Sequence, residues 1–349
     1  MVRVVGIDPG TLSIDVCGIV DGQIYLDRSW PTAEATADPA GLVEFLTTPG
    51  PPDLVVGPSG YGLPLRRATE ATDTDLRLAF LAPPGETGGI GGLRELAGAL
   101  AASGLPVVFV PGVIHLDTVP AHRKLNRVDL GTADKLCAAA LGIRDQCDNR
   151  GRHLEEASFI LIELGGAFTA GVAVERGQVV DGIGGTSGPI GWRAAGALDG
   201  EVAFLAGEIT KSALFRGGIM SILEQATAPR SVAIEAYTEG ATKAARQLRC
   251  SAPSADEILL SGRNAGNAEI RKGMESALAD IGPVRPLTGF ASIAKQGAQG
   301  AALLADGLAG GAQAALVNRL RIREAGGTVL DHLVFVSPAE ARRRLGIEE

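Results

Sequence analysis

The sequence has few aromatic residues and no excess of basic charge. Aromatic side chains make up 4% of the 349 residues, although hydrophobic residues as a whole reach 46%, enough for sizeable cores. Acidic residues outnumber basic ones, and the formal net charge is −8. This balance argues against a nucleic-acid partner, because a nucleic-acid-binding surface normally carries a basic patch. A local group of basic side chains can still bind an anionic substrate.

Cysteines are also rare, and long apolar runs are missing. The four cysteines, Cys17, Cys137, Cys147 and Cys250, are scattered and form no CxxC pair, so neither a zinc knuckle nor a disulfide framework is expected. No segment reaches the apolar length of a membrane span, and the first residues show no signal-peptide pattern. We therefore expect a cytoplasmic protein with reduced thiols and no membrane partner.

The first stretch that could carry chemistry is residues 4–20. An apolar strand runs into a turn with Asp8 and Gly10, and the chain returns as a second strand, which predicts a β-hairpin. Gly10 allows a ligand to approach the backbone and leaves an N–H for phosphate, while Thr11 and Ser13 add hydroxyl donors. Asp8 could hold a hydrated Mg²⁺. An ordinary hairpin with an acidic turn explains this stretch equally well.

A similar pattern returns at residues 158–174. An apolar strand ends near Glu163, a turn contains Gly165 and Gly166, and a second strand begins around Thr169. An internal repeat of this kind predicts two halves that open with the same hairpin. Chance similarity between two glycine-rich hairpins is the alternative.

Strands and helices alternate along the rest of the chain and predict an α/β protein. We expect an N-terminal lobe over residues 1–150, with an insertion at about 63–105, and a C-terminal lobe over 151–310. Residues 311–349 are expected to form a tail of helix-strand-helix form, with its strand at 333–336.

Two β-β-β-α-β-α halves that each open with an acid-and-glycine hairpin resemble the actin-like ATPase superfamily of sugar kinases, acetate kinases and Hsp70. The turn over residues 8–11 resembles its first phosphate loop, and residues 163–169 resemble the second, where the superfamily more often has Asp. Residues 259–263 resemble the adenosine motif. The helices expected at 131–141 and 291–308 resemble the two helices that cross between the lobes.

Within the superfamily, the chain most resembles a group described as predicted butyrate kinases. The stretches that carry this resemblance are Gly6–Thr11, Gly57–Pro64, Asn126–Lys135 and Gly297–Ala302. It implies a two-lobed actin-like ATPase (ribonuclease H-like) fold with a nucleotide cleft between the lobes. The implied activity is ATP-dependent phosphoryl transfer to a small molecule, and the favoured acceptor is a short-chain carboxylate such as butyrate, which would give an acyl phosphate.

The resemblance also implies roles for individual residues. ATP and Mg²⁺ would bind in the cleft, with Asp8 and Glu163 beside the metal. The nucleotide would contact both hairpins and the adenosine motif, through Gly10, Thr11, Gly165, Gly166, Thr169, Ser261, Gly262 and Arg263. The acceptor would lie nearer the first lobe, against Ser59, Gly60, Tyr61, Arg123 and Asn126.

The residues leave the acceptor chemistry open. A carboxylate acceptor is already ionised at neutral pH and needs cations, for which Arg66, Arg123 and Arg127 are candidates. A hydroxyl acceptor needs a base, which Asp129 or Asp134 could be. Helix capping by Asp129 and a solvent-facing position for Asp134 are the ordinary alternatives. The candidate catalytic residues are Asp8, Arg127, Asp129 and Asp134.

Other functions remain open beside the carboxylate kinase. The chain could phosphorylate a small hydroxylated metabolite, or it could be an actin-like ATPase switch that acts on a partner protein. Convergent cations in an acceptor pocket would favour a kinase, whereas a shallow cleft beside an exposed apolar patch would favour the switch. A dinucleotide-dependent dehydrogenase is disfavoured, because the first strand returns as a hairpin and does not feed a crossover helix. A homodimer is one of the oligomeric states left open.

Overall fold

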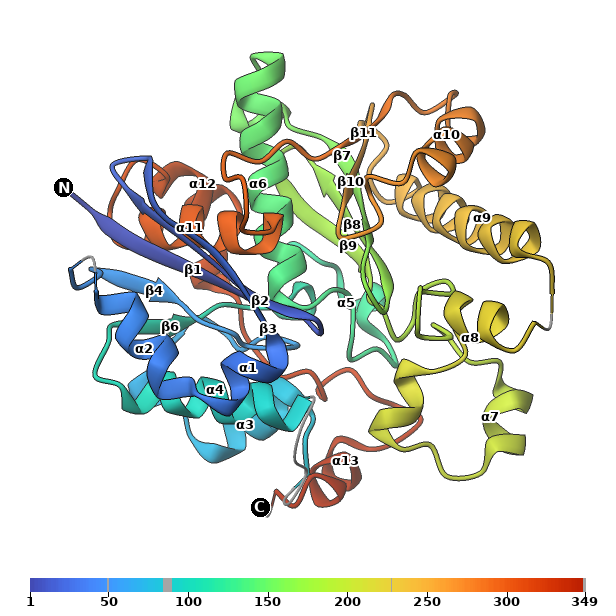
Figure 1. Cartoon of the computed structure of the whole chain (residues 1–349), viewed down its shortest axis with the longest axis horizontal. Helices are drawn as coiled ribbons and strands as arrows, with labels where there is room; N and C mark the ends of the chain where they lie inside the picture. Colours follow the sequence, from blue (N-terminus) through green and yellow to red (C-terminus); the bar gives the residue numbers. More distant parts are fainter. Residues whose placement is uncertain (49, 84–89, 227, 348–349) are drawn as a thin grey trace.

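The computed structural model of the chain describes residues 1–48, 50–83, 90–226 and 228–347. These residues form two β-sheets with helices between them and on their outer faces (Figure 1). Residues 84–89, which belong to the insertion expected at about 63–105, lie outside the described part of the chain.

The first sheet has six strands in the order β3-β2-β1-β4-β6-β5. Their bounds are β1 (Arg3–Pro9), β2 (Ser13–Val20), β3 (Gln23–Pro31), β4 (Leu54–Val56), β5 (Arg66–Arg67) and β6 (Val107–Phe109). Strands β1, β2 and β3 are antiparallel neighbours, whereas β4 is parallel to β1 and β6 is parallel to β4. The carboxyl ends of β1, β4 and β6 therefore meet at one edge of the sheet.

The second sheet has five strands in the order β11-β10-β7-β8-β9. Their bounds are β7 (Phe159–Leu164), β8 (Thr169–Glu175), β9 (Gln178–Ile183), β10 (Ile258–Ser261) and β11 (Val284–Pro286). Strands β7, β8 and β9 are again antiparallel, and β10 and β11 extend the sheet in parallel. The two sheets share one strand plan, and the two-lobed α/β fold predicted from the repeated hairpins is confirmed.

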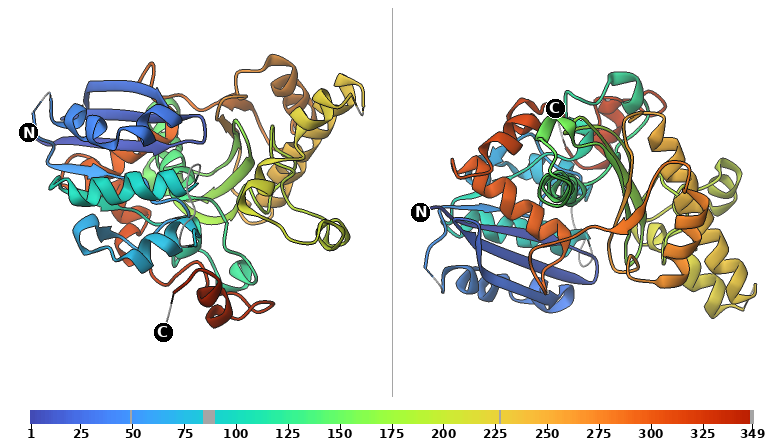
Figure 2. Two further views of the ribbon diagram at one scale, coloured as in Figure 1. Left: turned by 60° about the horizontal axis from the view of Figure 1, so that its bottom comes forward. Right: turned by 90° about the horizontal axis from the view of Figure 1, so that it is seen from above.

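Two helices lie between the sheets, α6 (Ala133–Arg150) and α11 (Gln296–Leu308). Helix α11 packs on β1 and β2, α6 packs on β7 and β8, and the two helices pack on each other. Figure 2 shows α6 nearly end-on between the sheets in the view from above. A Cβ added to Gly300 of α11 would lie 1.8 Å from the carbonyl oxygen of Cys137 in α6. Only a glycine allows so close a helix contact.

The remaining helices cover the outer faces of the sheets and the ends of the chain. Those of the first lobe are α1 (Thr32–Ala37), α2 (Pro39–Thr47), α3 (Asp73–Phe80), α4 (Ile90–Ala102) and α5 (Ala121–Lys124). Those that follow the second hairpin are α7 (Gly200–Ala206), α8 (Ile219–Glu224), α9 (Arg230–Arg249), α10 (Ala268–Ala277), α12 (Ala314–Arg319) and α13 (Pro338–Arg344). None of the described helices combines the length and the apolar character that a bilayer crossing requires.

The expected strand at residues 333–336 is wrong. This segment is irregular, and Phe335 is 92% exposed. Its backbone N–H groups at Val334 and Phe335 both donate to Oδ1 of Asn126, at 2.8 Å. A single side chain therefore takes the hydrogen bonds that a neighbouring strand would take in a sheet, and the apolar pattern alone does not make a strand.

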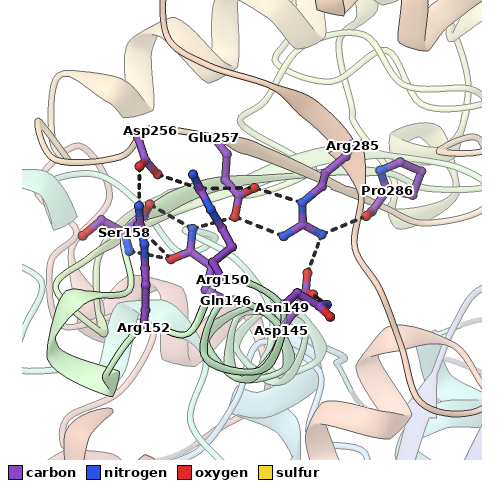
Figure 3. A network of polar contacts seen from close by, with 10 residues as sticks. All are labelled: Asp145, Gln146, Asn149, Arg150, Arg152, Ser158, Asp256, Glu257, Arg285 and Pro286. Atoms are coloured by element: carbon purple, nitrogen blue, oxygen red, sulfur yellow. Dashed lines mark hydrogen bonds and ion pairs between the residues drawn. The ribbon is translucent and has the colours of Figure 1, made fainter.

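A buried polar network fixes the C-terminal half of α6 to the second sheet (Figure 3). Arg285 of β11 donates to Asp145 at 2.6 Å and to Glu257 at 2.9 Å. Gln146 of α6 donates to the same Glu257 at 2.6 Å. Both carboxylates are nearly fully buried, with 3% and 1% of their surface exposed. Buried charges are tolerated only when they are paired and hydrogen-bonded, so this network holds α6 in place.

Candidate active site

A cavity of about 440 Å³ lies where the two glycine hairpins face each other. Its walls come from the β1–β2 turn, the β7–β8 turn, the beginning of α6 and the turn after β10. The two hairpins also touch, because a Cβ on Gly166 would lie 2.8 Å from Cδ1 of Leu12. Segments that are far apart in the sequence thus meet around one space, at the carboxyl ends of β1, β7 and β10.

Asp8, at the end of β1, is a buried carboxylate with an unused oxygen. It is 6% exposed, and its Oδ1 has no hydrogen-bond partner among the described residues. Burial and the nearby charge of Asp134 raise the pKa of Asp8 to about 8. Gly297, in the first turn of α11, lies directly against this carboxylate, since a Cβ there would be 2.6 Å from Oδ2. An unpaired buried carboxylate is costly, and a bound cation would relieve that cost.

The residues at Asp8 fit Mg²⁺. This ion is usually held through one or two carboxylates and by water and substrate phosphates, rather than by a full protein cage. Consistent with this, the described residues contain no group of three or more His, Cys, Asp and Glu side chains that could hold a metal ion alone. A single carboxylate with an unused oxygen, beside two glycine turns, is compatible with a hydrated magnesium ion.

A lysine lies among the other acidic groups of the cavity. The Nζ of Lys135 contacts Asp134 at 2.5 Å and Glu163 at 2.9 Å. Burial alone would lower the pKa of Lys135, but the two carboxylates outweigh it and raise that pKa. Burial would raise the pKa of Asp134, yet Lys135 and a hydrogen bond from Thr132 hold it below its usual value. For Glu163 burial dominates, and its pKa is raised.

Asp129 lines another part of the cavity and is held in a fixed orientation. Its Oδ1 accepts from the backbone N–H of Gly131 at 3.0 Å, and its Oδ2 accepts from the N–H and hydroxyl of Thr186 at 3.3 and 3.1 Å. Burial raises the pKa of Asp129 despite these donors. The helix-capping alternative does not hold, because Thr132 is the N-cap residue of α6 and no side chain caps it.

Most of the residues expected at the site line this cavity. They are Asp8, Gly10, Thr11, Gly60, Tyr61, Asp129, Asp134, Glu163, Gly165, Gly166, Gly262 and Arg263. The turn that follows β9 reaches the same place through Gly185 and Thr186. The cavity therefore gathers residues from both hairpins, from the adenosine-like turn and from the loop before α6.

Three expected acceptor residues lie elsewhere, and the structure corrects their placement. Arg123 donates to the backbone oxygen of Val180 at 2.7 Å and so supports β9. Asn126 holds the tail segment described above. Arg127 is exposed and does not line the cavity. Of the loop between α5 and α6, Asp129 and Thr132 line the cavity, whereas Asn126 and Arg127 do not.

Three further expected residues also lie outside the cavity lining. The hydroxyl of Ser59 donates to Val110 at 3.0 Å, and that of Thr169 donates to Ile190 at 3.2 Å. Ser261 is buried beneath the β10 turn, and its hydroxyl has no partner among the described residues. These side chains support the walls of the cavity from behind. Arg66, the remaining candidate cation, pairs with Asp75 at 2.7 Å on the surface.

Sequence reasoning missed two groups of cavity residues. Lys295, which precedes α11, contacts Asp15 at 3.1 Å and the hydroxyl of Ser13 at 2.5 Å. The predicted helix began at 291 and so placed this lysine within it, whereas α11 begins at Gln296. The second group is an apolar wall that consists of Phe80, Leu93, Phe168, Leu214 and Phe215. Only Leu214 and Phe215 are neighbours in the sequence, and the other members come from separate segments, so no spacing in the sequence joins the wall.

The strand plan, the two central helices and the paired glycine hairpins define an actin-like ATPase fold. Solved kinases share it. A propionate kinase from Francisella tularensis subsp. tularensis SCHU S4 matches with a TM-score of 0.60 at 14% identity, over 86% of this chain and 99% of that chain. The acetate kinase from Entamoeba histolytica matches with a TM-score of 0.56 at 12% identity, over 80% and 87% of the two chains.

The chain thus has the actin-like ATPase fold. Residues 6–335 match the model of the family described as "Protein of unknown function (DUF1464)", and the chain belongs to that family. The Porphyromonas gingivalis acetate kinase is a further structural neighbour, with a TM-score of 0.55 at 11% identity, over 80% of this chain and 88% of that chain. Curated protein sequences contain no match.

Proposed function

We propose that the chain is an ATP-dependent phosphotransferase that acts on a small-molecule acceptor. The observation that carries this proposal is Asp8, whose buried Oδ1 lacks a partner at the point where two glycine hairpins face one cavity. Phosphoryl transfer needs positioning and neutralisation of charge more than covalent help from the protein. The acetate and propionate kinases that share the fold support the same class of reaction.

The lining residues suit the parts of a magnesium nucleotide. Backbone N–H groups at Gly10, Gly165 and Gly166 would donate to phosphate oxygens, while Gly262 and Arg263 would contact the rest of the nucleotide. Asp8 would hold Mg²⁺ through its water shell. When bound, the ion neutralises charge on the phosphates during transfer.

A short-chain carboxylic acid is the first candidate acceptor. The apolar wall suits an aliphatic chain, and two structural neighbours act on acetate or propionate by their names. A carboxylate oxygen would bond to the terminal phosphorus of ATP as the bond to ADP breaks, giving an acyl phosphate. Lys295 and Arg263 are two of the lining cations that could orient it.

A small hydroxylated metabolite is the second candidate, and the position of Asp129 favours it. Asp129 lines the cavity, whereas Arg66, Arg123 and Arg127, the cations expected for a carboxylate, do not. Asp129 would accept the hydroxyl proton as the new O–P bond forms. Its raised pKa brings it nearer to neutral pH, where a general base works best.

The test is ATP turnover by the purified protein with Mg²⁺, across short-chain acids and small alcohols, with hydroxylamine to trap any acyl phosphate. Asp129→Asn separates the candidates: it should slow a hydroxyl acceptor by about 100-fold or more, and an acid acceptor by far less. Asp280→Asn, which removes the surface partner of Arg246, is the control. Nucleotide binding without turnover on any acceptor would instead favour the switch that acts on a partner protein.

Several expectations remain predictions beside this proposal. They are a cytoplasmic location and the absence of membrane and nucleic-acid partners, while the oligomeric state is left open, with a homodimer among the options. The division of the chain at about residues 150 and 310 is a further one. Limited proteolysis and light scattering of the purified protein would test the division and the oligomeric state.

A further inference from the structure

Lys135 occupies a position that is unfavourable for a lysine. It is in the first turn of α6, where the helix dipole repels a positive charge, and its side chain is only 16% exposed. It is nevertheless held by acidic groups from two elements, Asp134 of α6 and Glu163 of β7. Burial and the helix dipole both disfavour the charge of Lys135, and its two acidic partners compensate for that cost. All three side chains line the cavity.

The contacts of Lys135 use the acidic groups that a second metal ion would need. Asp134 accepts from Lys135 and from the hydroxyl of Thr132, and Glu163 accepts from Lys135 at 2.9 Å. By contrast, Asp8 keeps an oxygen without a partner among the described residues. Asp8 thus has an oxygen that lacks a partner among the described residues, whereas Asp134 and Glu163 already share a cation.

We propose that Lys135 is a built-in cation that takes the place of a second metal ion, so that the site binds one divalent cation, at Asp8. This inference rests on the proposed nucleotide site, and it reassigns Glu163 from metal ligand to partner of the lysine. An ammonium has three N–H donors, and the contacts to Asp134 and Glu163 account for two of them. The third is available to an anion in the cavity, where a fixed positive charge helps phosphoryl transfer without reorganisation.

The test counts bound Mn²⁺ in the absence of nucleotide and acceptor, by electron paramagnetic resonance titration. Wild-type protein should bind at most one Mn²⁺ per chain, and Lys135→Met should bind one more, because Asp134 and Glu163 become free. Lys135→Arg keeps the charge and should not gain the additional ion. Lys295→Met is the matched control. It removes the other lysine of the cavity, which pairs with a single acidic residue, and it should not gain the additional ion either.

A second variant keeps the test decisive if Lys135→Met does not fold. Glu163→Gln should leave the number and affinity of bound Mn²⁺ unchanged, whereas loss of a true metal ligand would weaken binding about tenfold or more. Two Mn²⁺ ions in the wild type, or weakened binding in Glu163→Gln, would overturn the proposal. The count does not depend on turnover, so an absence of kinase activity would refute the proposed function and leave the role of Lys135 to be judged separately.

Discussion

At the scale of single residues, two buried carboxylates of the first hairpin differ in whether their oxygens have polar partners. Asp8 and Asp15 lie opposite each other in the β1–β2 pairing. Asp15 accepts from Ser13 and pairs with Lys295, while one oxygen of Asp8 has no partner in the described part of the chain. A protein tolerates such an orphaned group where function requires it and at a cost in stability.

Removing the charge of Asp8 should therefore stabilise the protein. Because its pKa is raised to about 8 from 3.8, the folded state binds its proton more tightly than the unfolded state. The stability that Asp8 contributes is then full below pH 3.8 and is lost as the pH rises to about 8. In Asp8→Asn the gain in unfolding free energy over wild type should grow by up to about 1.4 kcal/mol per pH unit between pH 5 and 8.

Urea unfolding at several pH values measures this gain, and nucleotide turnover should be lost in the same variant. Asp15→Asn is the matched control: it leaves Lys295 without its carboxylate and should destabilise the protein. A variant at Asp8 that is less stable than wild type at pH 8 would contradict the interpretation of Asp8 as an unpaired metal-binding carboxylate.

The sequence predicted the site residues that lie in short contiguous patterns, and it missed those that only the tertiary fold brings to the cavity. Asp8, Gly10 and the turn from Glu163 to Gly166 lie in short local patterns, so the two hairpins could be found by inspection. Phe215 and Lys295 reach the cavity only through the tertiary fold, and no local signal marks them. Asn126 and Asp129 lie in the same polar loop, and the sequence could not show which of them turns inward.

At the scale of elements, burial decides which apolar runs become strands. The apolar runs of β1 and β7 predicted central strands correctly, because helices and neighbouring strands cover them. β5 and β11 have two and three residues and are too short for a periodic pattern, so they were not predicted. The run at 333–336 has the pattern of a strand but no partner strand beside it.

The network at the end of α6 should make the largest electrostatic contribution of a single arginine to stability. Arg285→Met would leave Asp145 and Glu257 buried without their shared cation, and should lower the unfolding free energy by about 3 kcal/mol. Arg246→Met is the matched control, because its pair with Asp280 lies on the surface, and its loss should change stability little. Chemical denaturation of both variants measures the difference, and equal effects would contradict the structural role of this network.

At the scale of the whole molecule, the two central helices set the geometry of the site. The first turn of α6 carries Asp134 and Lys135 into the cavity, and the first turn of α11 places Gly297 against Asp8. Both helices are fixed by the same close contact further along, between Gly300 and Cys137. A change in their separation must therefore move the two walls of the cavity relative to each other.

Gly300→Ala should thus impair the site from a distance. The added Cβ would meet the carbonyl oxygen of Cys137 at 1.8 Å, so the helices must separate, at a cost of about 2 kcal/mol or more. Nucleotide affinity should fall along with stability, because Asp8 and Lys135 are carried by different sides of this contact. Gly266→Ala is the control, since a Cβ there meets open space and should change neither quantity.

Thermal unfolding with and without Mg·ATP measures both effects, since a ligand that binds only the folded state raises the melting temperature according to its affinity. A variant at Gly300 that loses stability but keeps the full nucleotide-induced shift would show that the helix contact supports the fold without setting the site.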